Sequence, residues 1–252
     1  MTMSAETKKS TKIQPLTAIK ALRALVRDPE DTAQVYTIVH ALSGKSHLRT
    51  TEKFRQSPAG AKMLNERKEL LDTLMDRETL SKLPAGSFGR AYLDFLTREN
   101  ISPEGLIEAG EHVRDEEEAD TDEGFVGRRI RDMHDTWHVL TGYGRDGFGE
   151  LCVLAFSNGQ NWNPGFAAII GIGILNIAKG ASLFKVIGAT REAYRHGKLS
   201  TWLLEEDFEA LFPLPLHEVR AKLNIKDPLI YKSAYDIIEA TRPENRDQLA
   251  TA

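Results

Sequence analysis

Two histidines and two carboxylates lie within seventeen residues in the middle of this chain. They are His134, Asp135 and His138 and, after eleven further residues, Glu150. On a helix, His134 and His138 lie one turn apart and Asp135 precedes His138 by three positions, so all three side chains can reach one point. Imidazole and carboxylate together favour Zn²⁺ or Fe²⁺, allow Mn²⁺ or Mg²⁺, and suit Ca²⁺ poorly. The four residues predict a divalent-metal site, and with it an active site.

Two other interpretations compete with a metal site. A bare pair of histidines four positions apart would favour a structural role, with each ring paired to a local carboxylate. The adjacent Asp135 and the later Glu150 shift the balance towards metal. A variant zinc-protease motif, with Asp135 replacing the general-base glutamate, is disfavoured because aspartate is one methylene shorter and reaches a metal-bound water less easily.

A helix followed by a chain reversal would position these side chains. The pattern predicts a helix over Gly124–Gly142, in which both histidines border the core-facing stripe of Val126, Ile130, Met133, Trp137 and Leu140. Four glycines then break the helix and permit a tight reversal: Gly142, Gly144, Gly147 and Gly149. Their spacing fits no phosphate-binding loop. The next apolar segment, 151–156, can pack antiparallel to the first and return Glu150 over the histidines.

The rest of the chain also shows helical periodicity, and no convincing alternating strand is present. Helix starts are predicted at Pro15, Ser57-Pro58, Ser87 and Ser102-Pro103. The first of these helices carries Leu16, Ile19, Leu22 and Val26 on one face, the second helical stripe is Val35, Ile38, Val39 and Leu42, and the helix after Ser87 would bury Phe88, Tyr92, Phe95 and Leu96. The predicted fold is all-α, a single domain over 15–240 between a disordered tail (1–14) and a flexible C-terminal tail (241–252). A boundary near residue 120 is the alternative.

Composition narrows the functional classes. A formal charge of −4 over 252 residues argues against nucleic-acid binding, which would need a basic face. The single cysteine, Cys152, excludes an internal disulfide, fits a reducing compartment, and is expected as a buried thiol. The first fourteen residues lack the apolar core of a secretory signal and the arginines of a transit peptide. The acidic run 115–123 favours a solvated helix end and linker over a weak cation site or partner surface.

The metal-site residues and their neighbours resemble the ubiquinone (coenzyme Q) biosynthesis family usually called COQ-four. Its signature is His-Asp-x-x-His, eleven residues and Glu, which stands here at His134, Asp135, His138 and Glu150. The flanking segments 131–133 and 137–143 match as well, and two distant elements are similar: Leu-Pro-Ala-Gly-Ser at 83–87 and Pro-Leu-His-Glu-Val-Arg at 215–220. The resemblance covers roughly 15–230, with all four ligand positions kept.

The resemblance implies an all-helical protein that binds a divalent metal and acts on a polyprenylated aromatic precursor of ubiquinone. The implied reaction is oxidative decarboxylation, in which a hydroxyl replaces the ring carboxylate, with the four ligands as catalytic residues. Fe²⁺ could activate O₂ for this step, whereas Zn²⁺ would act as a Lewis acid alone. The chain looks like a bacterial member, cytoplasmic and peripheral to the inner membrane. Other ubiquinone-biosynthesis enzymes are its expected partners, and a homo-oligomer its expected state.

Further residues are candidates for contacting such a substrate. Arg131, beside the histidines, and Arg145, in the turn, could bind a carboxylate, although each could equally form a structural ion pair. The apolar run 166–178 is too short to span a bilayer. It could be a central buried helix, or its Ala168, Gly171 and Ile172 could line a tunnel for an isoprenoid tail or touch the bilayer.

Two rival functions remain open from the sequence. One is a non-catalytic scaffold that holds prenyl lipids for ubiquinone-biosynthesis enzymes, with a structural or vestigial metal. The other is an enzyme of another prenyl-lipid pathway, such as carotenoid or related quinone metabolism.

Overall fold

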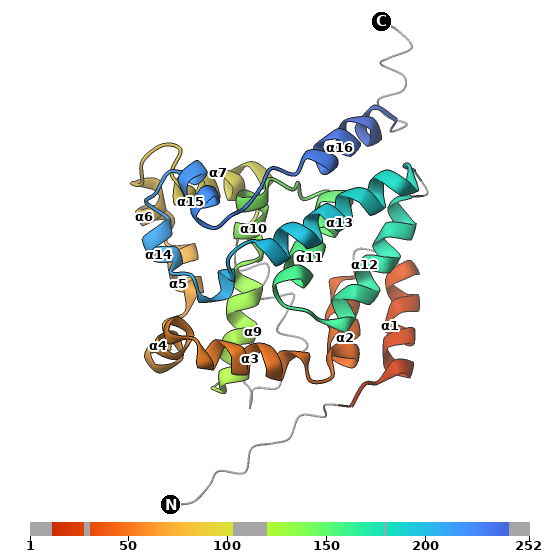
Figure 1. Cartoon of the computed structure of the whole chain (residues 1–252), viewed down its shortest axis with the longest axis horizontal. Helices are drawn as coiled ribbons and strands as arrows, with labels where there is room; N and C mark the ends of the chain where they lie inside the picture. Colours follow the sequence, from red (N-terminus) through yellow and green to blue (C-terminus); the bar gives the residue numbers. More distant parts are fainter. Residues whose placement is uncertain (1–11, 28–30, 103–119, 179, 242–252) are drawn as a thin grey trace, which may run out of the picture.

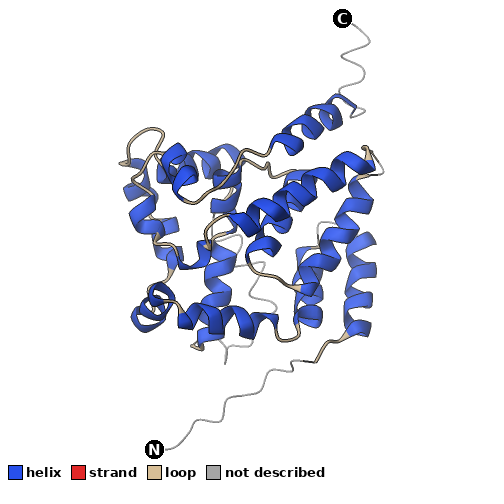
Figure 2. Cartoon of the chain, in the orientation of Figure 1, coloured by secondary structure: helices blue, strands red, loops and turns tan. Residues whose placement is uncertain are grey.

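The computed structural model describes residues 12–27, 31–102, 120–178 and 180–241. Within these ranges the chain folds into helices joined by short connections, as Figure 2 shows. The described ranges contain no strand. Ser87 and Pro215 form an isolated antiparallel β-bridge. The all-α prediction is confirmed.

The helices follow one another as labelled in Figure 1. Before the gap at 103–119 they are α1 (Pro15–Arg27), α2 (Thr32–Ser43), α3 (Ser46–Gln56), α4 (Pro58–Glu66), α5 (Leu70–Met75), α6 (Arg77–Ser81) and α7 (Phe88–Glu99). After it come α9 (Asp122–Asp132), α10 (His134–Thr141), α11 (Gly147–Gln160), α12 (Pro164–Ile177), α13 (Leu183–Leu199), a 3₁₀ turn η2 (Leu203–Glu205), α14 (Phe208–Leu211), α15 (Leu216–Lys222) and α16 (Leu229–Thr241).

Side-chain caps begin the helices where the sequence predicts them. The Ser57 hydroxyl accepts a hydrogen bond from the Gly60 amide at 3.0 Å, and Pro58 occupies the first position of α4. Ser87 caps α7 in the same way, accepting from the Arg90 amide at 3.3 Å. These two predictions are confirmed, whereas the predicted start at 102–103 reaches outside the described residues.

One hydrophobic core joins the segments on either side of the gap at 103–119. Helix α7 contributes the four residues predicted for its buried face: Phe88, Tyr92, Phe95 and Leu96. The same cluster extends to Phe54 in α3 and to Phe156 and Cys152 in α11, so the predicted buried thiol is also confirmed. An ion pair of 2.9 Å between Arg55 and Asp122 ties α3 to α9 at the surface. The described chain is therefore a single helical domain without a boundary near residue 120.

A smaller cluster joins α1, α2 and α12 around Ala21, Ile38 and Ile169, on the right of Figure 1. Helix α1 begins at Pro15 as predicted, but the stripe predicted to be its apolar face is largely exposed: Leu16, for example, is 76% exposed. The residues that α1 buries are Ala18 and Ala21, because small side chains allow it to lie close against α2.

The structure also contradicts one of the two interpretations of the apolar run 166–178, which lies in α12. It packs against α11 on one side and α2 on the other, but Gly165 and Ile169 are its only buried residues. The interpretation as a central buried helix is wrong, because most positions of α12, which lies on the right of Figure 1, are only half-buried and Gly171 and Leu175 are exposed. Among the described residues, no helix has both the length and the apolar character needed to cross a bilayer.

Candidate metal centre

The predicted helix over Gly124–Gly142 is two helices, α9 and α10, that meet at Met133. The Met133 carbonyl accepts hydrogen bonds from the Thr136 hydroxyl at 2.6 Å and from the Trp137 amide at 3.2 Å. The prediction of one continuous helix is wrong, because Met133 interrupts it. Its consequence for the site is that His134 opens α10.

The reversal after α10 is tighter than the sequence suggests. Gly142 ends α10 in the left-handed conformation, with φ of 78°. The Asp146 carboxylate caps α11 by accepting hydrogen bonds from two backbone amides of its first turn, at 2.9 and 3.2 Å. Gly147 and Gly149 therefore belong to α11, and of the four glycines only Gly142 and Gly144 lie outside the helices.

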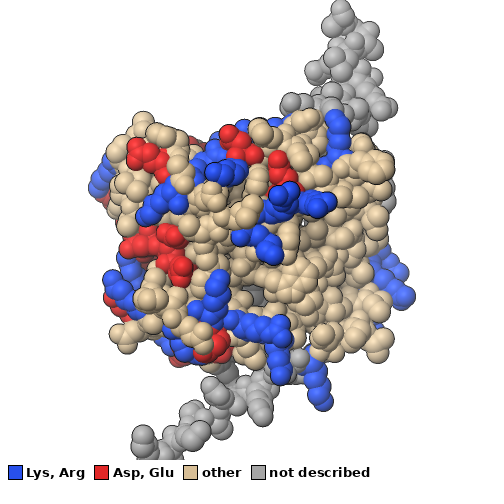
Figure 3. Space-filling view, viewed as in Figure 1, with Lys and Arg blue, Asp and Glu red and all other residues tan. Residues whose placement is uncertain are grey.

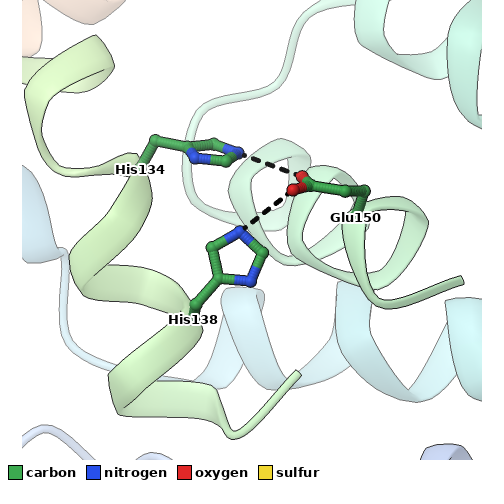
Figure 4. A group of neighbouring side chains, drawn as sticks. All are labelled: His134, His138 and Glu150. Carbon is green, nitrogen blue, oxygen red and sulfur yellow. Dashed lines mark ion pairs between the residues drawn. The ribbon is translucent and has the colours of Figure 1, made fainter. Parts of the chain in front are cut away.

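Gly149 is required by the closeness of the two chain segments. A Cβ atom at this position would lie 2.0 Å from the Gly144 carbonyl oxygen and 2.7 Å from its amide nitrogen. Only glycine permits this approach without displacing the backbone. The approach sets Glu150 in the first turn of α11, directly facing α10 (Figure 4).

Figure 4 shows the Glu150 carboxylate pointing at both imidazoles of α10. Its Oε2 atom lies 3.4 Å from His134 Nε2, and its Oε1 atom lies 3.4 Å from His138 Nε2. One ligand atom from each of the three side chains falls within 4.8 Å of the others. The predicted return of Glu150 over the histidines is confirmed.

The other nitrogen of each ring determines what faces Glu150. His138 Nδ1 lies 3.1 Å from the Tyr143 carbonyl oxygen, which can only accept, so we assign the proton to Nδ1. His134 Nδ1 likewise lies 3.3 Å from the Asp135 carboxylate. Phe95 stacks on the His138 ring, with centroids 5.5 Å apart, and fixes its orientation. In these tautomers both Nε2 atoms turn a lone pair towards the carboxylate.

Three acceptors that face one point need a cation between them. The Nε2 atom of His138 is buried and makes no hydrogen bond, although Glu150 lies near it. Without a metal, a proton serves this role. Burial opposes the charge on His134, but its contacts with Asp135 and Glu150 raise its pKa to about 9. Burial likewise opposes ionisation of Glu150, whose pKa the two imidazoles nevertheless lower to about 2.

The donor set fits a divalent metal of the catalytic kind. Two imidazole nitrogens and one carboxylate leave coordination positions open, as in catalytic zinc sites and in non-haem iron sites with two histidines and a carboxylate. The His138 side chain is fully buried, whereas those of His134 and Glu150 are 24% and 34% exposed. The site therefore opens to solvent on one side.

Asp135 does not join the three gathered ligands. Its carboxylate contacts the far nitrogen of His134, so it lies where a residue that orients and polarises a metal-bound imidazole would lie. This position differs from that of the direct ligand predicted from the sequence.

The two candidate arginines differ in their surroundings. Arg131 donates from Nε and Nη2 to one oxygen of Asp132, at 2.8 and 2.6 Å, and both side chains are almost buried. Arg145 is exposed in the turn between α10 and α11, and no ion pair joins it to the described residues. Arg131 thus forms the structural ion pair that was the alternative to substrate binding. The guanidinium of Arg145 is available to a ligand.

The candidate tail-binding residues share one stripe of α12. Ala168 and Ile172 are half-buried and Gly171 is exposed. Helix α12 contacts α11 at Gly173, where a Cβ would lie 2.9 Å from the side chain of Leu151, the residue after Glu150. At 100° per residue Gly173 lies on nearly the opposite side of α12 from Ala168, Gly171 and Ile172, so the stripe faces away from α11.

Sequence reasoning missed the residues that hold the rings in place. Phe95 comes from α7, and only its packing places it on His138. Tyr143 acts through its backbone carbonyl, which no side-chain pattern reveals. Sequence reasoning also did not name Asp132 as the partner of Arg131, although the two are adjacent in the sequence and that adjacency was an available signal for the ion pair.

Comparison with known proteins shows the family of the chain. A family model described as "Coenzyme Q (ubiquinone) biosynthesis protein Coq4" matches residues 5–229. The chain belongs to the Coq4 family. The resemblance inferred from the His-Asp-x-x-His and Glu signature is thereby confirmed, and with it membership in a family of ubiquinone biosynthesis.

Similar Coq4 proteins include animal relatives. The ubiquinone biosynthesis protein COQ4 homolog of Danio rerio is 27% identical over 221 residues, which cover 87% of this chain and 79% of the relative. The Homo sapiens homolog is 31% identical over 179 residues, covering 70% of this chain and 64% of the relative. Both relatives are described as mitochondrial. The chain thus spans somewhat less than two thirds of the human relative's length.

A solved structure shares the Coq4 fold. The crystal structure of a putative ubiquinone biosynthesis protein from Nostoc punctiforme superposes with a TM-score of 0.64 at 20% identity. The match covers 84% of this chain and 96% of that one. At this identity the likeness concerns the fold.

Proposed function

We propose that this protein catalyses a metal-dependent oxidative decarboxylation in ubiquinone biosynthesis. The substrate is a polyprenylated hydroxybenzoate-type ring, whose carboxylate leaves as CO₂ and is replaced by a hydroxyl. The observation that carries the proposal is the convergence of two imidazole Nε2 atoms and the Glu150 carboxylate on one point that opens to solvent.

His134, His138 and Glu150 would hold the metal, with Asp135 orienting His134. Bound there, a divalent metal supplies a Lewis acid for charge developing on the ring and, if it is iron, a route for O₂ to act as the oxidant. The oxidant is needed because exchanging carboxylate for hydroxyl removes two electrons from the ring.

The protein's own residues would bind and orient the substrate. Arg145 is exposed at the reversal and available to form a charge-assisted hydrogen bond with the ring carboxylate. Arg131 already donates to Asp132 and is the weaker candidate. The stripe of Ala168, Gly171 and Ile172 offers a partly exposed apolar strip for an isoprenoid tail, on the side of α12 that faces away from α11.

A non-catalytic scaffold for prenyl lipids is the second candidate. We call His134, His138 and Glu150 the metal triad. The scaffold is favoured by the electrostatics of this triad, since His134 and Glu150 already form an ion pair without a metal. Under this hypothesis the triad fixes α10 against α11, and the apolar surface of α12 holds lipids for other ubiquinone-biosynthesis enzymes. Under either function, the protein would work as a peripheral membrane protein on the cytoplasmic side, as a homo-oligomer that contacts those enzymes.

A His134→Ala variant in a deletion strain separates the two candidates. The catalytic function predicts loss of ubiquinone and accumulation of a carboxylated, prenylated precursor. His217→Ala is the matched control, because His217 is exposed on α15 away from the triad. A folded His134→Ala protein that restores ubiquinone would eliminate the catalytic proposal and leave the scaffold.

Metal and lipid analysis refine the same proposal. Iron in protein purified without oxygen would support the full oxidative reaction, whereas zinc would restrict the metal to Lewis-acid chemistry. Lipid profiling of the deletion strain tests the pathway. Unchanged ubiquinone together with altered carotenoids would assign the protein to another prenyl-lipid pathway.

A further inference from the structure

Six large apolar side chains are exposed where α12, α13 and α16 come together. Their exposed fractions range from 41% to 86%, with Phe184 the most exposed. We name this set the apolar corner: Leu175 near the end of α12, Leu183, Phe184 and Ile187 at the start of α13, and Leu229 and Ile230 at the start of α16. Clustered exposure on this scale marks an interaction site more often than a chance surface.

The helices that form the apolar corner are fixed to one another. The Glu192 carboxylate in α13 accepts hydrogen bonds from the backbone amides of Ile230, at 2.9 Å, and Tyr231, at 3.3 Å. A Cβ at Gly188 would lie 3.4 Å from the Ile230 side chain, so the two helix starts are in contact. The corner is therefore a preformed surface.

Cationic side chains continue from the apolar corner along α13. Phe184, Ile187, Arg191, Arg195 and Lys198 follow at spacings of three and four, which places them on one face of the helix. The last three are exposed, and no ion pair joins them to an acidic side chain of the described chain. We call these three the basic stripe.

Figure 3 shows the two regions side by side. Lys and Arg side chains gather over the middle of this face, where α13 crosses it in Figure 1, and a broad area without charge lies towards the upper right, where α12 meets α13. Apolar groups at one end and cations along the same face are the pattern of a surface that lies on an anionic bilayer.

A second copy of the chain fits this surface less well. A symmetric dimer through the apolar corner would place the same patch of each subunit against its twin. The basic stripe of one α13 would then approach that of the other, and like charges that meet in an interface cost affinity. An anionic lipid surface complements both the apolar corner and the basic stripe.

The geometry points to a membrane-docking face on which the apolar corner enters an anionic bilayer and the basic stripe contacts the lipid phosphates. The inference rests on the proposed function in one respect, namely that a prenylated substrate resides in the bilayer. The partly exposed stripe of Ala168, Gly171 and Ile172 continues to Leu175, so a tail could pass from the docked corner along this side of α12.

Co-sedimentation of the full chain with vesicles tests the docking face. Wild-type protein is expected to bind phosphatidylcholine vesicles that contain phosphatidylglycerol. Phe184→Glu should weaken this binding by about tenfold or more, because an exposed phenyl ring no longer enters the hydrocarbon. The matched control is Leu16→Glu, another highly exposed apolar position at the start of α1, which should bind like the wild type.

A second variant tests the basic stripe. Arg195→Gln removes one cation and should lower binding to the anionic vesicles by about fivefold, with no change on pure phosphatidylcholine. Neither variant should alter folding, since both side chains are exposed.

Several outcomes would overturn the docking face. They are absence of wild-type vesicle binding, equal losses for Phe184→Glu and Leu16→Glu, or a dimer in solution that Phe184→Glu dissociates, which would assign the corner to a second copy. The outcome is independent of catalysis, because His134→Ala protein should bind vesicles normally. Docking without metal-dependent activity would disprove the proposed function alone.

Discussion

The metal triad and the apolar corner reverse the usual distribution of side chains in opposite ways. At the triad, α10 and α11 bury polar groups: His138 and Asp135 are 2% and 4% exposed. At the corner, α12, α13 and α16 expose large apolar groups, with Phe184 at 86%. Folding alone favours neither arrangement.

The two regions also differ in how they are held. Each imidazole of the triad has its second nitrogen bonded and one ring stacked, so the ligand atoms are fixed. In the apolar corner the backbone is fixed, through Glu192, while the side chains have few neighbours. A centre for chemistry needs fixed side chains, whereas a surface that meets fluid lipid needs only a fixed frame.

The largest contrast is expected from adding one methyl group to each region. Gly149→Ala places a Cβ against the Gly144 backbone and should destabilise the protein by about 3 kcal/mol or more, with loss of metal binding. Gly171→Ala on α12 meets no atom within 4 Å and should be neutral or stabilise by about 0.5–1 kcal/mol through helix propensity.

Urea unfolding of both glycine variants, together with metal analysis, measures this contrast. Gly147→Ala is a control inside α11 itself, since a Cβ there is also unobstructed. If Gly149→Ala kept wild-type stability and metal content, the close approach of the reversal to α11 would be disproved.

The triad region was the more predictable of the two because its determinants are local in the sequence. The histidine spacing, the turn glycines and Glu150 lie within seventeen residues, and local geometry alone brings them together. The caps at Ser57 and Ser87 were predictable for the same reason. Each depends on a contact over three residues.

The faces of α1 and α12 were not predictable in this way. Both helices carry apolar residues on more than one side, and which side is buried depends on partners distant in the sequence. Helix α1 buries Ala18 and Ala21 against α2 and leaves Leu16, Ile19 and Val26 exposed. The position of Asp135 depended on the orientation of the His134 ring, which the spacing alone does not fix.

A second test removes the most buried ligand. His138→Ala should abolish metal binding and also cost about 2–3 kcal/mol, because the Tyr143 carbonyl loses its hydrogen bond and Phe95 its stacking partner. Glu150→Gln keeps the side-chain volume at a partly exposed position and should abolish metal binding at a smaller cost in stability. Equal destabilisation by the two variants would contradict the difference in burial between these ligands.

A third test asks whether Asp135 binds the metal or orients its ligand. Asp135→Asn should lower metal affinity by about 10–100-fold while the fold persists, as expected for a residue behind a ligating histidine. Titration of the metal-free protein with Zn²⁺ gives the affinity. Complete loss of binding, as in Glu150→Gln, would instead restore Asp135 as the direct ligand that the sequence predicted.

The smallest effect is expected in the apolar corner. Phe184→Ser should change the free energy of unfolding by no more than about 0.5 kcal/mol, because the ring is already in solvent and folding buries little of it. Urea unfolding without lipid measures this change. A loss of unfolding free energy above about 1 kcal/mol would mean that the ring is packed in the folded protein and is not available to enter a membrane. A neutral result would separate the two regions: at the triad polar groups are buried within the fold, and at the corner apolar groups remain exposed for a surface outside it.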